Sequence, residues 1–261
     1  MPPPMPLDTW MHDSHMTSTH ADQDDDKDHL FHWSQGHVPR HPPVHAHRHL
    51  CLRLTPERAV VWPAERTVFI ADVHLGKAAV FRARGIPVPR GTTSAMLTRL
   101  TQLIARTQAQ RLVVLGDFLH ARESHAPATL AALRAWRADH ATLDCIVVQG
   151  NHDRHAGALE SSLGFTPQAQ PFEAPGLIGV HEASEAVPLL AHAAPDMPLV
   201  LAGHVHPVVT LRDRLDQLRL PCYRLSHNVL TLPAFGEFTG GHESHVPGDR
   251  LFAIAEKVHA L

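Results

Sequence analysis

Four short apolar segments of this chain each run directly into a polar motif that carries Asp, Asn or His. The apolar segments and the first Asp, Asn or His after each are 68–70 and Asp72, 112–115 and Asp117, 145–148 and Asn151, and 199–202 and His204. Apolar runs of this length are typical of buried strands. In open α/β sheets, ligands bind beyond the carboxyl ends of the strands. We therefore expect four strands to bring these motifs to one edge of a sheet.

The segments between these strands predict helices and, later in the chain, a second sheet. Residues 93–108 place Leu97, Leu100 and Ile104 on one helical face, and residues 127–139 show a similar spacing. Alternating strands and helices favour a parallel sheet covered by helices. Further strands are expected at 177–180, 208–210, 223–225, 228–232 and 251–255. A second sheet facing the first would bury them, so we predict an α/β sandwich of two sheets flanked by helices.

The chain divides into two parts by composition. Residues 1–49 are rich in Pro, Asp and His and lack apolar periodicity. Such a segment cannot bury enough surface to offset its ordering entropy, so we expect a disordered tail. Its histidines, among them His41, His45 and His47, leave open a metal-gathering tract. Residues 50–261 are expected to form the folded domain.

Composition sets the broad class of the protein. The net charge of −3 is uneven: residues 1–50 carry −4, and the rest of the chain is nearly neutral at +1. Bulk charge therefore neither requires nor excludes a nucleic-acid partner. No run of about 18 apolar residues is present, which argues against a membrane span. The start of the chain lacks a secretory signal and the three cysteines are scattered, so we expect a cytoplasmic protein.

The polar motifs carry donors that suit divalent metal ions. The seven candidate ligands are Asp72, His74, Asp117, Asn151, His181, His204 and His206. Carboxylate, amide and imidazole donors favour Mn²⁺, Fe or Zn²⁺ over a thiolate-bound metal. Each motif alone could be an ordinary turn or a helix N-cap. Together they are sufficient for two ions about 3.5–4 Å apart, an arrangement suited to in-line attack on phosphorus.

The whole set resembles the signature of the calcineurin-like metallophosphoesterase superfamily. That signature is Asp-x-His, Gly-Asp, Gly-Asn-His-Asp/Glu, His and Gly-His-x-His, and the match here runs from about residue 68 to 208. The resemblance implies a metallophosphoesterase-type sandwich of two mixed β-sheets with a binuclear centre at the strand ends. It also implies that Asp117 bridges the ions, with Asp72, His74 and His206 on one side and Asn151, His181 and His204 on the other.

The same motifs suggest a catalytic mechanism. A water held between two ions would have its pKa lowered and become a hydroxide nucleophile that attacks phosphorus in line. His152 follows a ligand and could stabilise the transition state or protonate the leaving oxygen. Asp153 could orient His152 and keep it cationic. We therefore predict His152 and Asp153 as the catalytic pair.

A finer resemblance covers about residues 51–258. The stretches 71–77, 85–89, 115–120 and 232–241 are similar to those of bacterial DNA-ligase-associated metallophosphoesterases. That group implies a Mn²⁺-dependent DNA endonuclease or phosphodiesterase that acts in repair of DNA damage. It also implies a DNA ligase, a helicase and a second nuclease as partners.

Candidate substrate contacts are fewer. Arg82, Arg84 and Arg154 lie next to metal motifs and could hold phosphates, although the first two could equally be solvated loop residues. Lys77 is expected to face solvent. Phenylalanines that could stack on bases, but are mostly expected in the core, are Phe81, Phe118, Phe235 and Phe238. Other histidines that could lie near the site without binding metal are His120, His155, His227, His242 and His245.

Three functions remain open from the sequence. The first is cleavage of phosphodiester bonds in DNA, preferably single-stranded. The second is hydrolysis of a small phosphodiester or a nucleotide pyrophosphate, which the metal motifs do not distinguish from the first. The third is a non-catalytic scaffold with the same fold. The complete ligand set and His152 argue against the scaffold.

Overall fold

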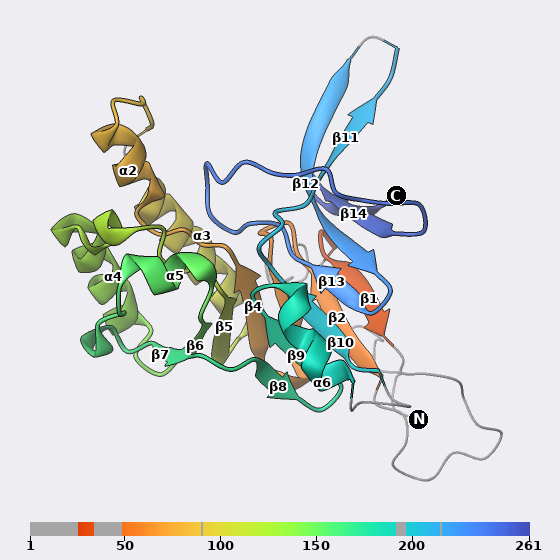
Figure 1. Ribbon diagram of the computed structural model, residues 1–261, viewed down its shortest axis with the longest axis horizontal. Coiled ribbons are helices and arrows are strands. Elements are labelled where there is room, and N and C mark those ends of the chain that lie inside the picture. Colours follow the sequence, from red (N-terminus) through yellow and green to blue (C-terminus); the bar gives the residue numbers. More distant parts are fainter. Residues whose placement is uncertain (1–25, 34–48, 90, 192–196, 215) are drawn as a thin grey trace, which may run out of the picture.

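The computed structural model describes residues 26–33, 49–89, 91–191, 197–214 and 216–261. Two β-sheets pack face to face, and helices cover the outer face of the first sheet (Figure 1). This is the α/β sandwich of two mixed sheets that the sequence predicts. None of the helices in the described part of the chain has the length and hydrophobicity to cross a bilayer.

The first sheet changes from antiparallel to parallel in its middle. Strands β1 to β4 pair antiparallel, and β4 to β7 pair parallel. In spatial order the strands are β1 (His29–Trp33), β2 (Leu50–Leu54), β3 (Val60–Trp62), β4 (Thr67–Ala71), β5 (Arg111–Leu115), β6 (Asp144–Val148) and β7 (Thr166–Gln168). The parallel pairs align the carboxyl ends of β4, β5 and β6 at one edge.

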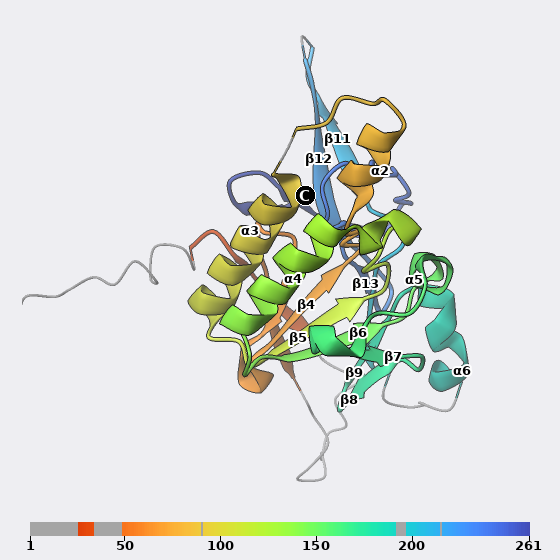
Figure 2. The same cartoon turned by 90° about the vertical axis from the view of Figure 1, so that its left-hand side faces the viewer.

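The second sheet holds the C-terminal strands. Its main path runs β15 (Val258–Ala260), β14 (Arg250–Ile254), β12 (Gln217–Ser226), β13 (Val229–Thr231), β10 (Leu199–Ala202), β9 (Leu177–Val180) and β8 (Phe172–Ala174), and β11 (Val208–Arg212) pairs with β12. Strands β11 and β12 form an antiparallel ribbon that projects from the body (Figures 1 and 2).

The helices follow the apolar periodicity of the sequence. Helices α3 (Thr92–Thr107) and α4 (Pro127–Asp139) match the predicted segments within one residue and lie side by side on the first sheet (Figure 2). The shorter helices are α2 (Lys77–Ala83), α5 (Asn151–Ala156) and α6 (Val187–Leu190).

Strand residues alternate between two cores. Val68 and Ile70 of β4 point into the core under the helices, whereas Phe69 and Ala71 point into the core between the sheets. This period of two fixes which residues face each layer. Because both faces are covered, β4 and β5 are apolar on both faces, which explains their continuous apolar sequences.

The prediction of a disordered tail is wrong for residues 28–33. His29–Trp33 forms β1, which pairs with β2 along its whole length, and Phe31 is buried. Asp28 accepts two hydrogen bonds from the Arg106 guanidinium, at 2.8 and 3.1 Å, and both side chains are buried. Such a bidentate pair anchors the segment to α3. Residues 1–25 and 34–48, including His41, His45 and His47 of the possible metal-gathering tract, lie outside the described residues.

Candidate metal centre

The predicted ligands meet where the strands of the two sheets end. Backbone hydrogen bonds tie the loops together: Asp72 N donates to Gly116 O, His74 N to Asp117 O, and Gly203 N to His181 O. The loops after β4, β5, β9 and β10 are therefore held in fixed register. The convergence predicted from the apolar segments is present in the structure.

The first ligand group consists of Asp72, His74 and His206. One donor atom from each lies within 4.8 Å of the others. The atoms Asp72 Oδ1, His74 Nε2 and His206 Nε2 are buried and have no hydrogen-bond partner within the described residues. His206 Nε2 is 3.4 Å from Asp72 Oδ1. Buried polar atoms are normally paired, so three unpaired ones converging on one point indicate a cation site.

The second ligand group consists of Asp117, His181 and His204, with Asn151 beside it. His181 Nε2 lies 2.8 Å from Asn151 Oδ1, 3.1 Å from His204 Nδ1 and 3.5 Å from Asp117 Oδ1. Its other ring nitrogen, Nδ1, lies 3.2 Å from the Leu115 carbonyl. A proton on Nδ1 donated to that carbonyl leaves the Nε2 lone pair free to bind a metal.

Asp117 lies between the two groups. Its Oδ1 faces His181 Nε2 at 3.5 Å, and its Oδ2 faces His74 Nε2 at 3.9 Å. Each carboxylate oxygen is thus directed to a different ligand group. This is the geometry that a bridging carboxylate requires, and the exposed fraction of Asp117 is only 2 %.

The site is built on strained backbone. Five of the seven predicted ligands have positive φ, between 46° and 69°: Asp72, His74, Asp117, His204 and His206. Non-glycine residues in this region cost about 1–3 kcal/mol each and are found at functional sites. Neighbouring glycines allow the close packing, because a Cβ on Gly116 would overlap His181 and one on Gly203 would overlap Asp72.

Burial shifts the pKa values of His74 and Asp117 in the centre. Desolvation, helped by the nearby Lys77, lowers the pKa of His74 to about 2, so its imidazole is neutral. Neutral imidazole is the form that binds a metal. Desolvation also raises the pKa of the Asp117 carboxyl above its usual value. A buried carboxylate of this kind is stabilised in its charged form by a neighbouring cation.

Comparisons with known proteins are consistent with a site for two metal ions. The family model described as calcineurin-like phosphoesterase matches residues 65–184. The nuclease MPE of Pseudomonas putida is 41 % identical, with a TM-score of 0.68, over 81 % of this chain and 96 % of that one. The chain belongs to the calcineurin-like phosphoesterase family. This family is dinuclear and metal-dependent, and the two joined ligand groups fit that requirement.

Two further solved structures show lower similarity to this phosphoesterase. AQ665 from Aquifex aeolicus, of unknown function, is 20 % identical over 57 % of this chain and 81 % of that one, with a TM-score of 0.37. The E. coli phosphoesterase Yfce is 19 % identical over 73 % of this chain and 92 % of that one, with a TM-score of 0.34. No curated protein matches the chain.

His152 of this phosphoesterase lies at the rim of the centre. Its Nε2 is 4.0 Å from Asp117 Oδ2, and 40 % of its side chain is exposed. Its Nδ1 is 3.0 Å from the His120 carbonyl, and its ring stacks on that of His120. His152 is therefore placed beside the ligands but open to a substrate, as expected for a residue that acts on the reacting group.

The expected role of Asp153 as the partner of His152 is wrong. Asp153 accepts hydrogen bonds from the backbone N–H groups of Phe118, Leu119 and Gly150, at 2.7 to 3.2 Å. The His120 carbonyl faces His152 Nδ1 instead. Asp153 thus joins the loop that follows β5 to the start of α5, and it acts on the ligands' positions rather than on the imidazole of His152.

The predicted substrate arginines are not gathered at the centre. Arg82 and Arg84 lie at the end of α2, where Arg82 donates to the Pro89 carbonyl at 3.3 Å. Arg154 is exposed and lies 3.5 Å from Glu185, whose other oxygen accepts the His181 backbone N–H.

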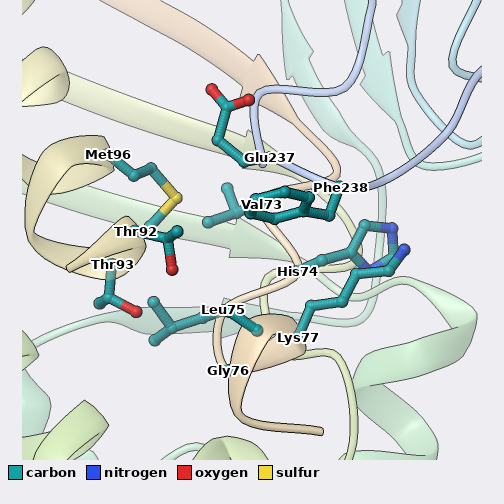
Figure 3. Close-up of a pocket in the computed structure, with 11 residues that line it drawn as sticks. Val73, His74, Leu75, Gly76, Lys77, Thr92, Thr93, Met96, Glu237 and Phe238 are labelled. Atoms are coloured by element: carbon teal, nitrogen blue, oxygen red, sulfur yellow. The ribbon is translucent and has the colours of Figure 1, made fainter. Parts of the chain in front are cut away.

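Two residues near the centre were not predicted as part of it. Lys77, expected to face solvent, is half-buried, and its pKa is lowered chiefly by burial while Asp117 and Asp72 oppose the shift. Figure 3 shows its side chain beside His74. His120, left undecided by the sequence, forms a cluster with His74 and His152, and its Nδ1 is 3.4 Å from His74 Nδ1. The local sequence around Lys77, at the start of α2, and around His120, in a loop, does not predict either contact.

Proposed function

We propose that this protein is a binuclear metal-dependent phosphodiesterase that cleaves single-stranded DNA. The observation that carries the proposal is the position of Asp117, whose two oxygens face two separate ligand groups. Similarity to a nuclease over 96 % of that protein's length supports DNA as the substrate.

The ligand roles follow from the two groups. Asp72, His74 and His206 would hold one ion, and Asn151, His181 and His204 the other, with Asp117 shared. Oxygen and imidazole donors of this kind suit Mn²⁺, Fe and Zn²⁺, and we propose Mn²⁺. When bound, a pair of ions activates a water for in-line attack and neutralises charge on the phosphate.

His152 would act on the leaving group or on the charge that develops on the phosphate. The His120 carbonyl accepts the proton on His152 Nδ1 and thereby fixes the ring orientation. Nε2 then faces the centre, 4.0 Å from Asp117 Oδ2, where a protonated ring would donate to a phosphate or leaving oxygen.

A role in repair of DNA damage, with a DNA ligase, a helicase and a second nuclease as partners, is a further proposal. It rests on the motif similarity at residues 71–77, 85–89, 115–120 and 232–241.

The test is cleavage of circular single-stranded DNA in the presence of Mn²⁺, with the product ends mapped. Opening of the circle demonstrates endonuclease activity, and an Asp117→Ala variant prepared in the same way controls for contaminating nucleases. Hydrolysis of bis(para-nitrophenyl) phosphate without any cleavage of DNA would instead assign the protein to small phosphodiesters.

A further inference from the structure

A groove adjoins the metal centre on the side of His206. It encloses about 330 Å³ and lies between the loop after β13 and the base of the β11–β12 ribbon. This volume falls within the range of about 300–1,000 Å³ that small-ligand sites occupy. His206 lies in its wall, so whatever occupies the groove is next to the first ligand group. The other residues that matter below are Arg58, Arg219, Glu237 and Phe238.

Phe238 presents an exposed aromatic ring at the edge of this groove. Its exposed fraction is 41 %, although most phenylalanines of the described residues are buried. Its backbone has a φ of 58°, a conformation that costs a non-glycine residue about 1–3 kcal/mol. Figure 3 shows the ring beside Val73, in a pocket that His74 also lines. The fold thus holds an aromatic face near the ligands, in a strained conformation.

The groove also carries positive charge. Arg58 is half-buried; its Nη1 lies 3.4 Å from the Ala234 carbonyl and 3.8 Å from Glu237 Oε1. Arg219, on the ribbon, donates to the Gly241 carbonyl. Glu237 is the acidic residue of the wall, and Arg99 pairs with it at 2.7 Å. Among the charged residues that line the groove, Arg58 and Arg219 outnumber Glu237, which favours an anionic occupant.

We propose that this groove binds the nucleotide next to the scissile phosphate of single-stranded DNA. Phe238 would stack on the unpaired base, and Arg58 and Arg219 would bind the flanking phosphates. Aromatic stacking combined with a basic groove is how proteins bind single strands without reading their sequence. A duplex would hide the base faces that Phe238 needs. This inference rests on the proposed function, because it assumes that DNA is the substrate.

The test compares two substrates across matched variants. Phe238→Ala and Arg219→Gln are each assayed on a single-stranded oligonucleotide and on bis(para-nitrophenyl) phosphate. Arg111→Gln, at the opposite end of β5 from the centre, is the control. We expect the ratio of kcat/KM for DNA to that for the small ester to fall about 5- to 150-fold in Phe238→Ala, as expected for one lost stacked base. Arg219→Gln should reduce the salt dependence of DNA binding by about 0.7 in the log–log slope.

A second variant separates stacking from backbone strain. Phe238→Gly removes the ring and also relieves the positive φ. Loss of DNA preference together with an unchanged or higher thermal midpoint would support the proposal. A wild-type ratio in both Phe238 variants would overturn the groove assignment while wild-type DNA cleavage persists. Absence of DNA cleavage by the wild-type enzyme would instead overturn the proposed function.

Discussion

Asp72, His74 and His206 bury their donor atoms without hydrogen-bond partners in the described structure, whereas the donor atoms of Asn151, His181 and His204 contact one another. The first group lies on short loops after β4 and β10. The second includes two exposed residues, Asn151 at the start of α5 and His204.

This difference indicates unequal roles for the two groups. An ion in the first group would satisfy three buried polar atoms at once, which makes its loss costly. The second group is more exposed, whereas the His152 ring lies beside His74 of the first group. We therefore expect the first ion to be held tightly and the second to exchange more readily.

The largest effect is expected from Asp117→Ala, which removes the carboxylate that lies between the two ligand groups. We predict that turnover is abolished in both DNA and small-ester assays, because both ions lose a ligand. Activity assays and metal analysis of the purified variant check this. Wild-type activity would show that Asp117 is not a bridge and that the two ligand groups work separately.

Removal of His152 tests whether catalysis can be separated from metal binding. His152→Ala should retain both ions and lower kcat about 10²- to 10⁴-fold, the usual contribution of a general acid or base. Metal content and kcat are measured on the same preparation. A variant that lost an ion would place His152 among the ligands of the first group, beside His74.

A paired substitution compares the two ligand groups directly. His206→Ala should leave the tighter site incomplete, whereas His204→Ala should still retain close to one equivalent of metal after dialysis against a weak chelator. The free energy of unfolding with metal present should fall more in His206→Ala, since a tightly bound ion stabilises the folded state more. Equal losses of bound metal from both variants would contradict the prediction that the first group holds its ion more tightly than the second.

The sequence predicted the convergence of the motif loops better than it predicted the surroundings of the candidate ligands. Asp and His placed after apolar strands mark a site because parallel strands align their ends, and this reasoning needs no tertiary detail. The role of Asp153 depended on which backbone N–H groups it meets, which no local pattern encodes. Strand β1 was missed because its sequence buries Phe31 while the adjacent Leu30 is 54 % exposed. Its anchor, Asp28 on Arg106, is a contact between residues far apart in the sequence.

The smallest effect is expected from Asp153→Asn, but this variant distinguishes the two ligand groups most directly. Asp153 accepts from Leu119 and Gly150, which lie two residues after Asp117 and just before Asn151. An amide keeps one acceptor oxygen and brings an N–H₂ group toward these donors, so we predict a loss of about 1–3 kcal/mol in unfolding free energy. The substitution should weaken metal binding mainly at the second ligand group. Metal titration followed by calorimetry should show weaker binding of the second ion with the first unchanged, and equal weakening of both would mean that Asp153 supports the whole centre.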